Sequence, residues 1–359
     1  MDRRAFLKAT ASAAAVVTVS DGAPAPAAAK PAARREKRMA VGCQRWGSNP
    51  ERLGFLLRCG VRRICISPAK PGPDRIWTAE TCQAARRAVE AVGMTAESMY
   101  WGVPIGVLVP DRRDAAIERC RKQVIAAGKG GIPCLAYTLN VRYWQARTGR
   151  EPGRGGGLYS AWDLAKATAK PGRRGIGPVT EDDMWDRITY FLRKVVPVAT
   201  EAKVRLGLHP PDPPMPKPNP FKTAQVLDTV EGLKRFVTIC DSPYHGLTFC
   251  QGCFWQMLPE EVKPAGLYKG IRWFGGRKRI FHVHFRNLRG GREKFVETFH
   301  DEGDIDMFEA VRTYKSVGYT GILMPDHVPH HEEDPQGLQH FAFAYGYIKG
   351  LIQAAYAKT

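Results

Sequence analysis

From residue 39 to the end of the chain, short apolar runs rich in β-branched residues alternate with longer stretches of helical period. This alternation predicts repeated strand–helix units, because neighbouring parallel strands must be joined by long crossovers that are usually helical. We count eight predicted strands: Met39 to Gln44, Arg63 to Ser67, Thr95 to Met99, Pro133 to Thr138, Arg205 to His209, Gly246 to Cys250, Ile280 to His284 and Gly321 to Pro325.

The predicted helices between these strands are amphipathic. They include Ala79 to Val92, Asp111 to Ala127, Glu181 to Ala202, Ala224 to Ile239, Met307 to Val317 and Leu338 to Ala357. Eight units in one chain predict an α/β fold, a (β/α)8 TIM barrel, for which about 250 residues is typical. An open doubly wound sheet is the alternative. Residues 141 to 180 are rich in Gly, Arg and Pro without a clear period, and we expect them to form a long loop inserted after the fourth strand, serving as a lid or substrate loop.

The first 29 residues have the pattern of a twin-arginine export signal. Arg3 and Arg4 precede an apolar run too short to cross a membrane, and Ala27-x-Ala29 suits signal peptidase. We therefore expect a signal peptide over 1–29, a basic disordered arm over 30–38, and a single barrel domain over 39–359. Export by the twin-arginine translocase to the periplasm or the exterior is the corresponding prediction.

The nine cysteines are an odd number and most lie in apolar runs, so no disulfide framework is predicted. Free thiols are compatible with export because the twin-arginine route carries proteins that have already folded. A formal net charge of +19 favours anionic partners. We expect a small acidic substrate rather than nucleic acid, since metal-dependent nucleases usually need several carboxylates around clustered metals.

In barrels of this kind the active site lies at the C-terminal ends of the strands. The last four predicted strands end at His209, Cys250, His284 and Asp326. Two imidazoles, a thiolate and a carboxylate that converge above the barrel form a plausible set of ligands for Mn, Fe, Co or Zn. Taken one at a time, each of these residues could be a structural side chain.

Three neighbours of these ligands are candidates for further roles. His327 is predicted to carry a proton, because the adjacent Asp326 already serves the metal. Arg286 lies two residues beyond His284, and we expect it to pair with a substrate carboxylate. Cys250 and Cys253 form a C-x-x-C pair, but we favour a ligand and its neighbour over a redox site.

Several segments resemble the mannonate dehydratase family, a group of xylose-isomerase-like barrels. The likeness is strongest in LGLHPPDPP, GLTFCQG, IFHVHFRN, FHDEGDIDMFEAVRTYKSVGYTGILMPDHVP and GYIKGL, and looser in RWG and LAYTLNVRYWQARTG. The resemblance implies that His209, Cys250, His284 and Asp326 bind Mn(II) or Fe(II). It also implies dehydration of D-mannonate to 2-keto-3-deoxy-D-gluconate, with His327 in acid/base work.

Within the same motifs, Tyr347 is a candidate partner acid, and Arg45, Arg286 and Asn287 are predicted to bind substrate. Pro211 replaces a carboxylate common in the family, and the end of the third strand also departs from the usual pattern. A metal-dependent sugar isomerase or epimerase of the same barrel group, and a periplasmic sugar-acid-binding protein without catalysis, therefore stay open. A homo-oligomer is possible.

Overall fold

A computed structural model describes residues 37–44, 49–72, 76–139, 146–168, 176, 179–221 and 224–357. Residues 38 to 359 form one compact unit. The predicted export signal, most of the basic arm and Arg45 lie outside the described residues. None of the described helices is both long and apolar enough to traverse a lipid bilayer.

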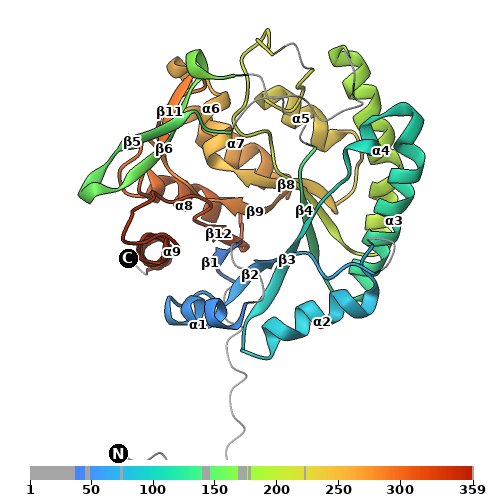
Figure 1. The fold of residues 1–359 in the computed structure, drawn as a ribbon, viewed down its shortest axis with the longest axis horizontal. Helices are drawn as coiled ribbons and strands as arrows, with labels where there is room; N and C mark the ends of the chain where they lie inside the picture. The colour runs from blue at the N-terminus through green and yellow to red at the C-terminus, as the bar shows by residue number, and fades with distance from the viewer. Residues whose placement is uncertain are drawn as a thin grey trace, which may run out of the picture. The chain divides into compact units, whose positions relative to one another are not determined.

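Eight parallel strands close into a barrel, which confirms the predicted (β/α)8 fold (Figure 1). Around the barrel the strands are β1 (Ala40–Cys43), β2 (Arg63–Ile66), β3 (Thr95–Trp101), β4 (Cys134–Tyr137), β7 (Arg205–Leu208), β8 (His245–Cys250), β9 (Ile280–His284) and β12 (Ile322–Met324). β12 pairs with β1, with Ala40 opposite Ile322, so the ring is complete. An open doubly wound sheet is therefore wrong.

The helices pack outside this ring (Figure 1). They are α1 (Pro50–Arg58), α2 (Ala79–Glu90), α3 (Arg113–Lys129), α4 (Glu181–Glu201), α5 (Val230–Thr238), α6 (Gln251–Met257), α7 (Ala265–Gly276), α8 (Met307–Ser316) and α9 (Leu338–Ala355). Local signals fix several of their starts. Thr180 and Asp183, for example, form a capping box that satisfies free N–H groups at the first turn of α4.

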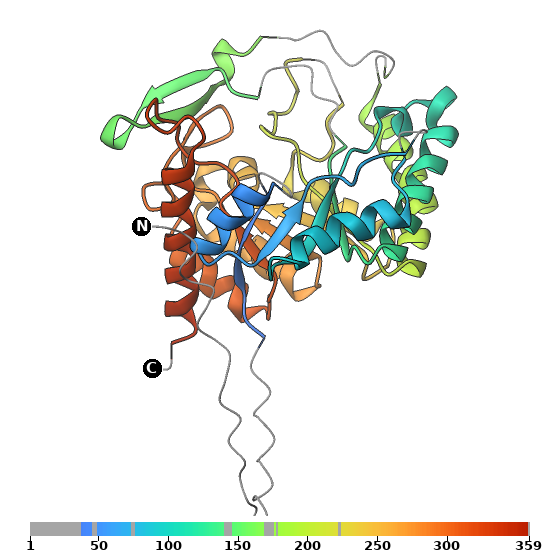
Figure 2. The ribbon, with the colours of Figure 1, turned by 60° about the horizontal axis from the view of Figure 1, so that its bottom comes forward.

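Part of the predicted long loop forms a small antiparallel sheet. β5 (Gly149–Pro152) and β6 (Leu158–Asp163) make a hairpin, and β6 pairs with β11 (Lys294–Glu297), which pairs with β10 (Leu288–Gly290). Figure 2 shows the hairpin in green near the start of α9, where Leu158 bridges to His330. The insertion after strand four is thereby joined to the segment that follows β9.

Candidate metal centre and active site

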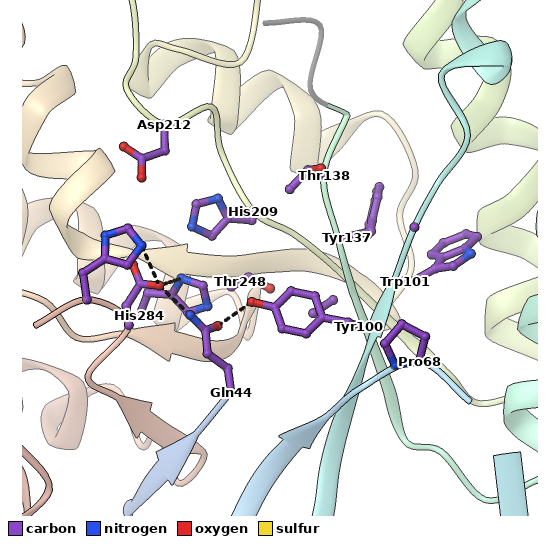
Figure 3. Close-up of a pocket in the computed structure, with 14 residues that line it drawn as sticks. Gln44, Pro68, Tyr100, Trp101, Tyr137, Thr138, His209, Asp212, Thr248 and His284 are labelled. Carbon is purple, nitrogen blue, oxygen red and sulfur yellow. Dashed lines mark hydrogen bonds and ion pairs between the residues drawn. The ribbon is translucent and has the colours of Figure 1, made fainter. Parts of the chain in front are cut away.

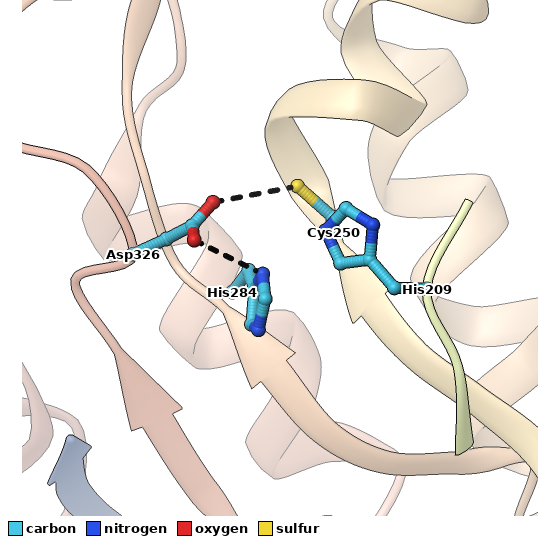
Figure 4. Close-up of side chains that lie close together, drawn as sticks. All are labelled: His209, Cys250, His284 and Asp326. Atoms are coloured by element: carbon cyan, nitrogen blue, oxygen red, sulfur yellow. Dashed lines mark hydrogen bonds and ion pairs between the residues drawn. The ribbon is translucent and has the colours of Figure 1, made fainter. Parts of the chain in front are cut away.

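Four barrel strands deliver the predicted ligands to one point (Figure 4). His209 follows β7, Cys250 and His284 are the last residues of β8 and β9, and Asp326 comes two residues after β12. One donor atom from each lies within 4.8 Å of the others. The His209 and His284 ring centroids are 4.7 Å apart. The sequence-based grouping of these residues is thus reproduced in space.

The donor set fits a divalent transition metal. Bonds from such an ion to nitrogen, oxygen and sulfur are about 2.0–2.3 Å long, so its ligands lie at most about 4.6 Å apart, close to the spacing of this cluster. His284 Nδ1 is buried without a hydrogen bond of good geometry among the described residues, although it lies 3.2 Å from Asp326 Oδ1. A buried nitrogen in this state is suited to a metal bond.

Electrostatics keep the sulfur and oxygen of the candidate ligands anionic. Burial raises the pKa of Cys250, but hydrogen bonding from Cys253 and the charge of Arg286 outweigh it and hold that pKa well below its usual value. Burial also raises the pKa of Asp326, and the positive charges of His284 and His327 overcome it, so this pKa is well below normal. Thiolate and carboxylate are the forms that bind metals.

His284 balances two opposing effects. Burial lowers its pKa, whereas Asp326 raises it, and the result is a pKa of about 9. Without an ion, the pair formed by His284 and Asp326 therefore holds a proton at neutral pH. Because an imidazole must be neutral to coordinate, a bound cation would take the place of that proton.

A second polar cluster lies beside the first. Asp212, Glu297 and His327 also have donor atoms within 4.8 Å of one another. Here two guanidinium groups already neutralise the carboxylates: Arg147 pairs with Asp212 at 3.0 Å and with Glu297, and Arg286 pairs with Asp212 at 3.2 Å and with Glu297. We therefore interpret this cluster as an ion-pair network rather than a second cation site.

His327 connects this network to the metal ligands. Its Nδ1 lies 2.6 Å from Glu297 Oε1, and its Nε2 lies 3.7 Å from Asp326 Oδ1. A carboxylate only accepts, so Nδ1 carries the hydrogen and Nε2 is left to exchange a proton. Partial burial lowers the pKa of His327, but the negative charges of Asp326 and Glu297 outweigh it and raise that pKa above its usual value.

A cavity of about 590 Å³ opens over the ligands (Figure 3). His209, His284 and Asp326 form part of its wall together with His327. The remaining lining residues are Gln44, Pro68, Tyr100, Trp101, Gly102, Ala136, Tyr137, Thr138, Asp212 and Thr248. A small polar molecule in this cavity would meet both the metal ligands and the His327 imidazole.

The predicted role of Arg286 needs correction. Its side chain is fully buried, and its guanidinium pairs with Asp212 and Glu297 instead of lining the cavity. Gly252 leaves room for Arg286 because it has no side chain: a Cβ at Gly252 would lie 2.3 Å from Arg286 Nε. Arg286 therefore neutralises the protein's own carboxylates, and it does not contact a substrate carboxylate directly.

Two further predictions are also corrected. Asn287 is buried and uses its amide within the chain: Nδ2 donates to the carbonyls of His300 and Ile305, and Oδ1 accepts from two backbone N–H groups. Tyr347 lies on the outer helix α9, where its ring stacks on Phe343, and it does not line the cavity. The sequence GYIKGL alone does not show whether Tyr347 faces the cavity or the outside of its helix. Arg45 lies outside the described residues.

Sequence reasoning missed Gln44, Tyr100, Arg147 and Glu297. Each meets partners far away in the sequence, as Gln44 does with Asp326, 282 positions later. Arg147 lay within a segment that resembles the family, LAYTLNVRYWQARTG, but no local pattern marked it as the partner of Glu297.

Comparisons with known proteins show the family of this chain. The family profile of D-mannonate dehydratase (UxuA) matches residues 176–359. A mannonate dehydratase of Thermotoga maritima is 36% identical over 330 residues, which cover 78% of this chain and 86% of the relative. The chain belongs to the mannonate dehydratase family. It is accordingly a lyase of the hydro-lyase type.

Solved structures give the same assignment for the fold. A mannonate dehydratase from Streptococcus suis serotype 2 superposes with a TM-score of 0.77 at 25% identity, covering 89% of this chain and 94% of the other. A xylose isomerase domain protein from Planctomyces limnophilus, at 14% identity and a TM-score of 0.57, shares the fold. The match covers 89% of this chain and 99% of the other chain. The mannonate dehydratase barrel is thus of the xylose-isomerase-like type.

Proposed function

We propose that the protein dehydrates D-mannonate, or a closely related aldonate, to 2-keto-3-deoxy-D-gluconate or the corresponding keto acid. The observation that carries the proposal is that His209, Cys250, His284 and Asp326 have donor atoms within 4.8 Å of one another, beside a cavity that three of them line, in a chain of the mannonate dehydratase family. The substrate loses the proton on C2 and the hydroxyl on C3 as water, and the resulting enol becomes the 2-keto acid.

We further propose that the four residues hold Mn(II) or Fe(II). Mixed nitrogen, sulfur and oxygen donors favour these ions over Mg or Ca. When bound, such an ion stabilises negative charge that develops on the carboxylate and C2 oxygens of the substrate.

His327 is the group placed to move a proton. His327 lines the cavity, and Glu297 fixes the tautomer by accepting the Nδ1 hydrogen, which leaves Nε2 to exchange a proton. A neutral Nε2 takes the C2 proton, and the imidazolium that forms is stabilised by Glu297 and Asp326. Arg147 and Arg286 keep Glu297 ionised: although burial raises the pKa of Glu297, His327 and the two guanidiniums hold it below its usual value.

A product assay tests the proposed function. Protein loaded with Mn²⁺ or Fe²⁺ is incubated with a panel of aldonates and neutral aldoses, and 2-keto-3-deoxy acids and epimers are measured. Formation of the keto acid from D-mannonate is the expected result. Epimers or ketoses from neutral sugars would support an isomerase or epimerase instead, and binding of acids without turnover would support a sugar-acid-binding protein.

We also propose that the protein is exported by the twin-arginine route to the periplasm or the exterior. Support comes from Arg3, Arg4 and the following apolar run in the sequence, which lie outside the described residues. Replacing both arginines by lysine is expected to keep the protein in the cytoplasm, as followed by cell fractionation. Unchanged export of the double variant would rule the route out.

A further inference from the structure

A hydrogen-bonded relay reaches the carboxylate of Asp326 from the wall of the cavity. The Tyr100 hydroxyl donates to Gln44 Oε1 at 2.8 Å, and Gln44 Nε2 donates to Asp326 Oδ1 at 2.5 Å (Figure 3). All three side chains line the same cavity. Neither Tyr100 nor Gln44 has a role in the proton transfer described above.

The relay crosses the place where the barrel closes. Tyr100 belongs to β3, Gln44 follows β1, and Asp326 follows β12. β1 pairs with β12 on one side and with β2 on the other, and β2 pairs with β3. The two hydrogen bonds thereby connect Asp326, which follows the last strand of the barrel, to Gln44 just after the first strand and to Tyr100 in the third.

Each hydrogen bond has a defined direction. The Asp326 carboxylate is ionised and can only accept, so Gln44 must turn its NH2 group toward it. The Gln44 carbonyl then faces the Tyr100 hydroxyl and requires a donor there. Burial raises the pKa of Tyr100, so its hydroxyl keeps the hydrogen that it donates. The carboxylate and the phenol therefore hold the amide in the same orientation.

Asp326 is a residue whose conformation has to be held in place. Its backbone φ is +48°, in the left-handed region that side-chain-bearing residues rarely adopt. Its Oδ1 accepts from Gln44, which leaves Oδ2 turned toward Cys250, 3.9 Å from the sulfur. Loss of the Gln44 contact would remove the hydrogen bond that holds Oδ1 in place beside its 3.2 Å contact with His284 Nδ1.

We propose that Gln44 and Tyr100 are positioning residues that fix the Asp326 carboxylate and thereby set the affinity of the metal site. Tyr100 acts through Gln44, and Gln44 acts through Asp326. The inference rests on the proposed metal site, and it concerns binding of the ion rather than the chemistry that follows.

The test measures Co²⁺ binding to metal-free protein by titration, together with the visible spectrum of the bound ion. Gln44→Ala is expected to weaken binding about 10- to 100-fold, the usual effect of losing a partner of a metal ligand. Tyr100→Phe removes a single oxygen and is expected to weaken binding about 3- to 10-fold. Both variants are expected to change the spectrum, because the carboxylate geometry changes.

Tyr137→Phe is the matched control. Tyr137 also lines the cavity, from the neighbouring strand β4, but its hydroxyl has no hydrogen-bond partner among the described residues. This variant is expected to bind Co²⁺ with the affinity and spectrum of the parent protein. Urea unfolding of all variants shows whether each is folded. Tyr100→Phe is expected to disturb folding less than Gln44→Ala, because it removes a single oxygen.

The double variant Gln44→Ala/Tyr100→Phe distinguishes a relay from two separate effects. If Tyr100 acts through Gln44, the double variant binds Co²⁺ no more weakly than Gln44→Ala alone. The proposal would be overturned if the two losses of Co²⁺ affinity multiply in the double variant. It would also be overturned if Tyr100→Phe has the affinity and spectrum of the parent protein. Cys250→Ala separates this outcome from failure of the metal site: if Cys250→Ala also binds Co²⁺ as tightly as the parent, the site itself is wrong.

Discussion

Asp326 and His327 are adjacent in the chain, but their side chains are placed for different tasks. Asp326 is buried among the proposed ligands, whereas the His327 side chain is 40% exposed and hydrogen-bonds to Glu297. We expect His327→Asn to bind the metal normally while kcat falls about 10²- to 10⁴-fold, the usual effect of losing a general base or acid. Metal analysis and steady-state kinetics on the same sample check this, and loss of the ion would make His327 a ligand instead.

Glu297 is predicted to matter through His327. Glu297→Gln keeps the shape of the side chain but removes the charge that selects the Nδ1–H tautomer, so kcat is expected to fall about 10- to 100-fold with little change in KM. Glu293→Gln, a nearby change in the loop before β11, is the control and is expected to leave kcat unaltered. A rise in KM alone would place Glu297 in substrate binding.

The grouping of His209, Cys250, His284 and Asp326 could be predicted because one rule, activity at the C-terminal ends of barrel strands, converts positions in the sequence into neighbours in space. No such rule applies to the ion-pair network. Glu297 and Arg147 are 150 positions apart, and they meet only because the hairpin β5–β6 pairs with β11. The roles expected for Arg286 and Asn287 failed for the related reason that burial and pairing are not visible in the sequence.

At the level of elements, all eight barrel strands were predicted to within a residue or two, because buried apolar runs mark them clearly. Three helices of the described residues were not among those named from the sequence. α6 is buried on every side and has no polar face, α7 is rich in glycine, and α1 is short. β5, with the sequence GREP, is exposed throughout and owes its conformation to pairing with β6.

The added sheet is expected to be a folded part of the domain and not a loose lid. Trp162 of β6 is fully buried beside β11, and its Nε1 donates to the Arg292 carbonyl at 3.2 Å. We expect Trp162→Ala to lower the free energy of unfolding by about 3–5 kcal/mol. Urea titration measures this change. A loss below about 1 kcal/mol would mean that the sheet opens independently of the barrel.

For the whole molecule, buried neutral histidines make stability depend on pH. Burial lowers the pKa of His245 to about 4, and His300 has a similarly lowered pKa of about 4 for the same reason. In an unfolded chain a histidine titrates near 6.5. Between pH 6.5 and 4 the unfolded state therefore binds protons that the folded state does not, and stability falls as the pH falls through this range.

The expected loss is about 3 kcal/mol for His245 on going from above pH 6.5 to below pH 4. His245→Gln removes the titrating group while keeping a donor for the Phe236 carbonyl, which His245 Nε2 contacts at 2.8 Å. Urea midpoints measured across this range should fall less steeply in the variant than in the parent. Equal slopes would show that folding does not lower the pKa of His245.

The proposed active site depends on a single ion shared by residues from four strands. Anomalous diffraction from crystals grown with Mn²⁺ tests this most directly. We predict one strong peak at bonding distance from His209, Cys250, His284 and Asp326 together. A peak among Asp212, Glu297 and His327, or no ion bonded to the Cys250 sulfur, would contradict it.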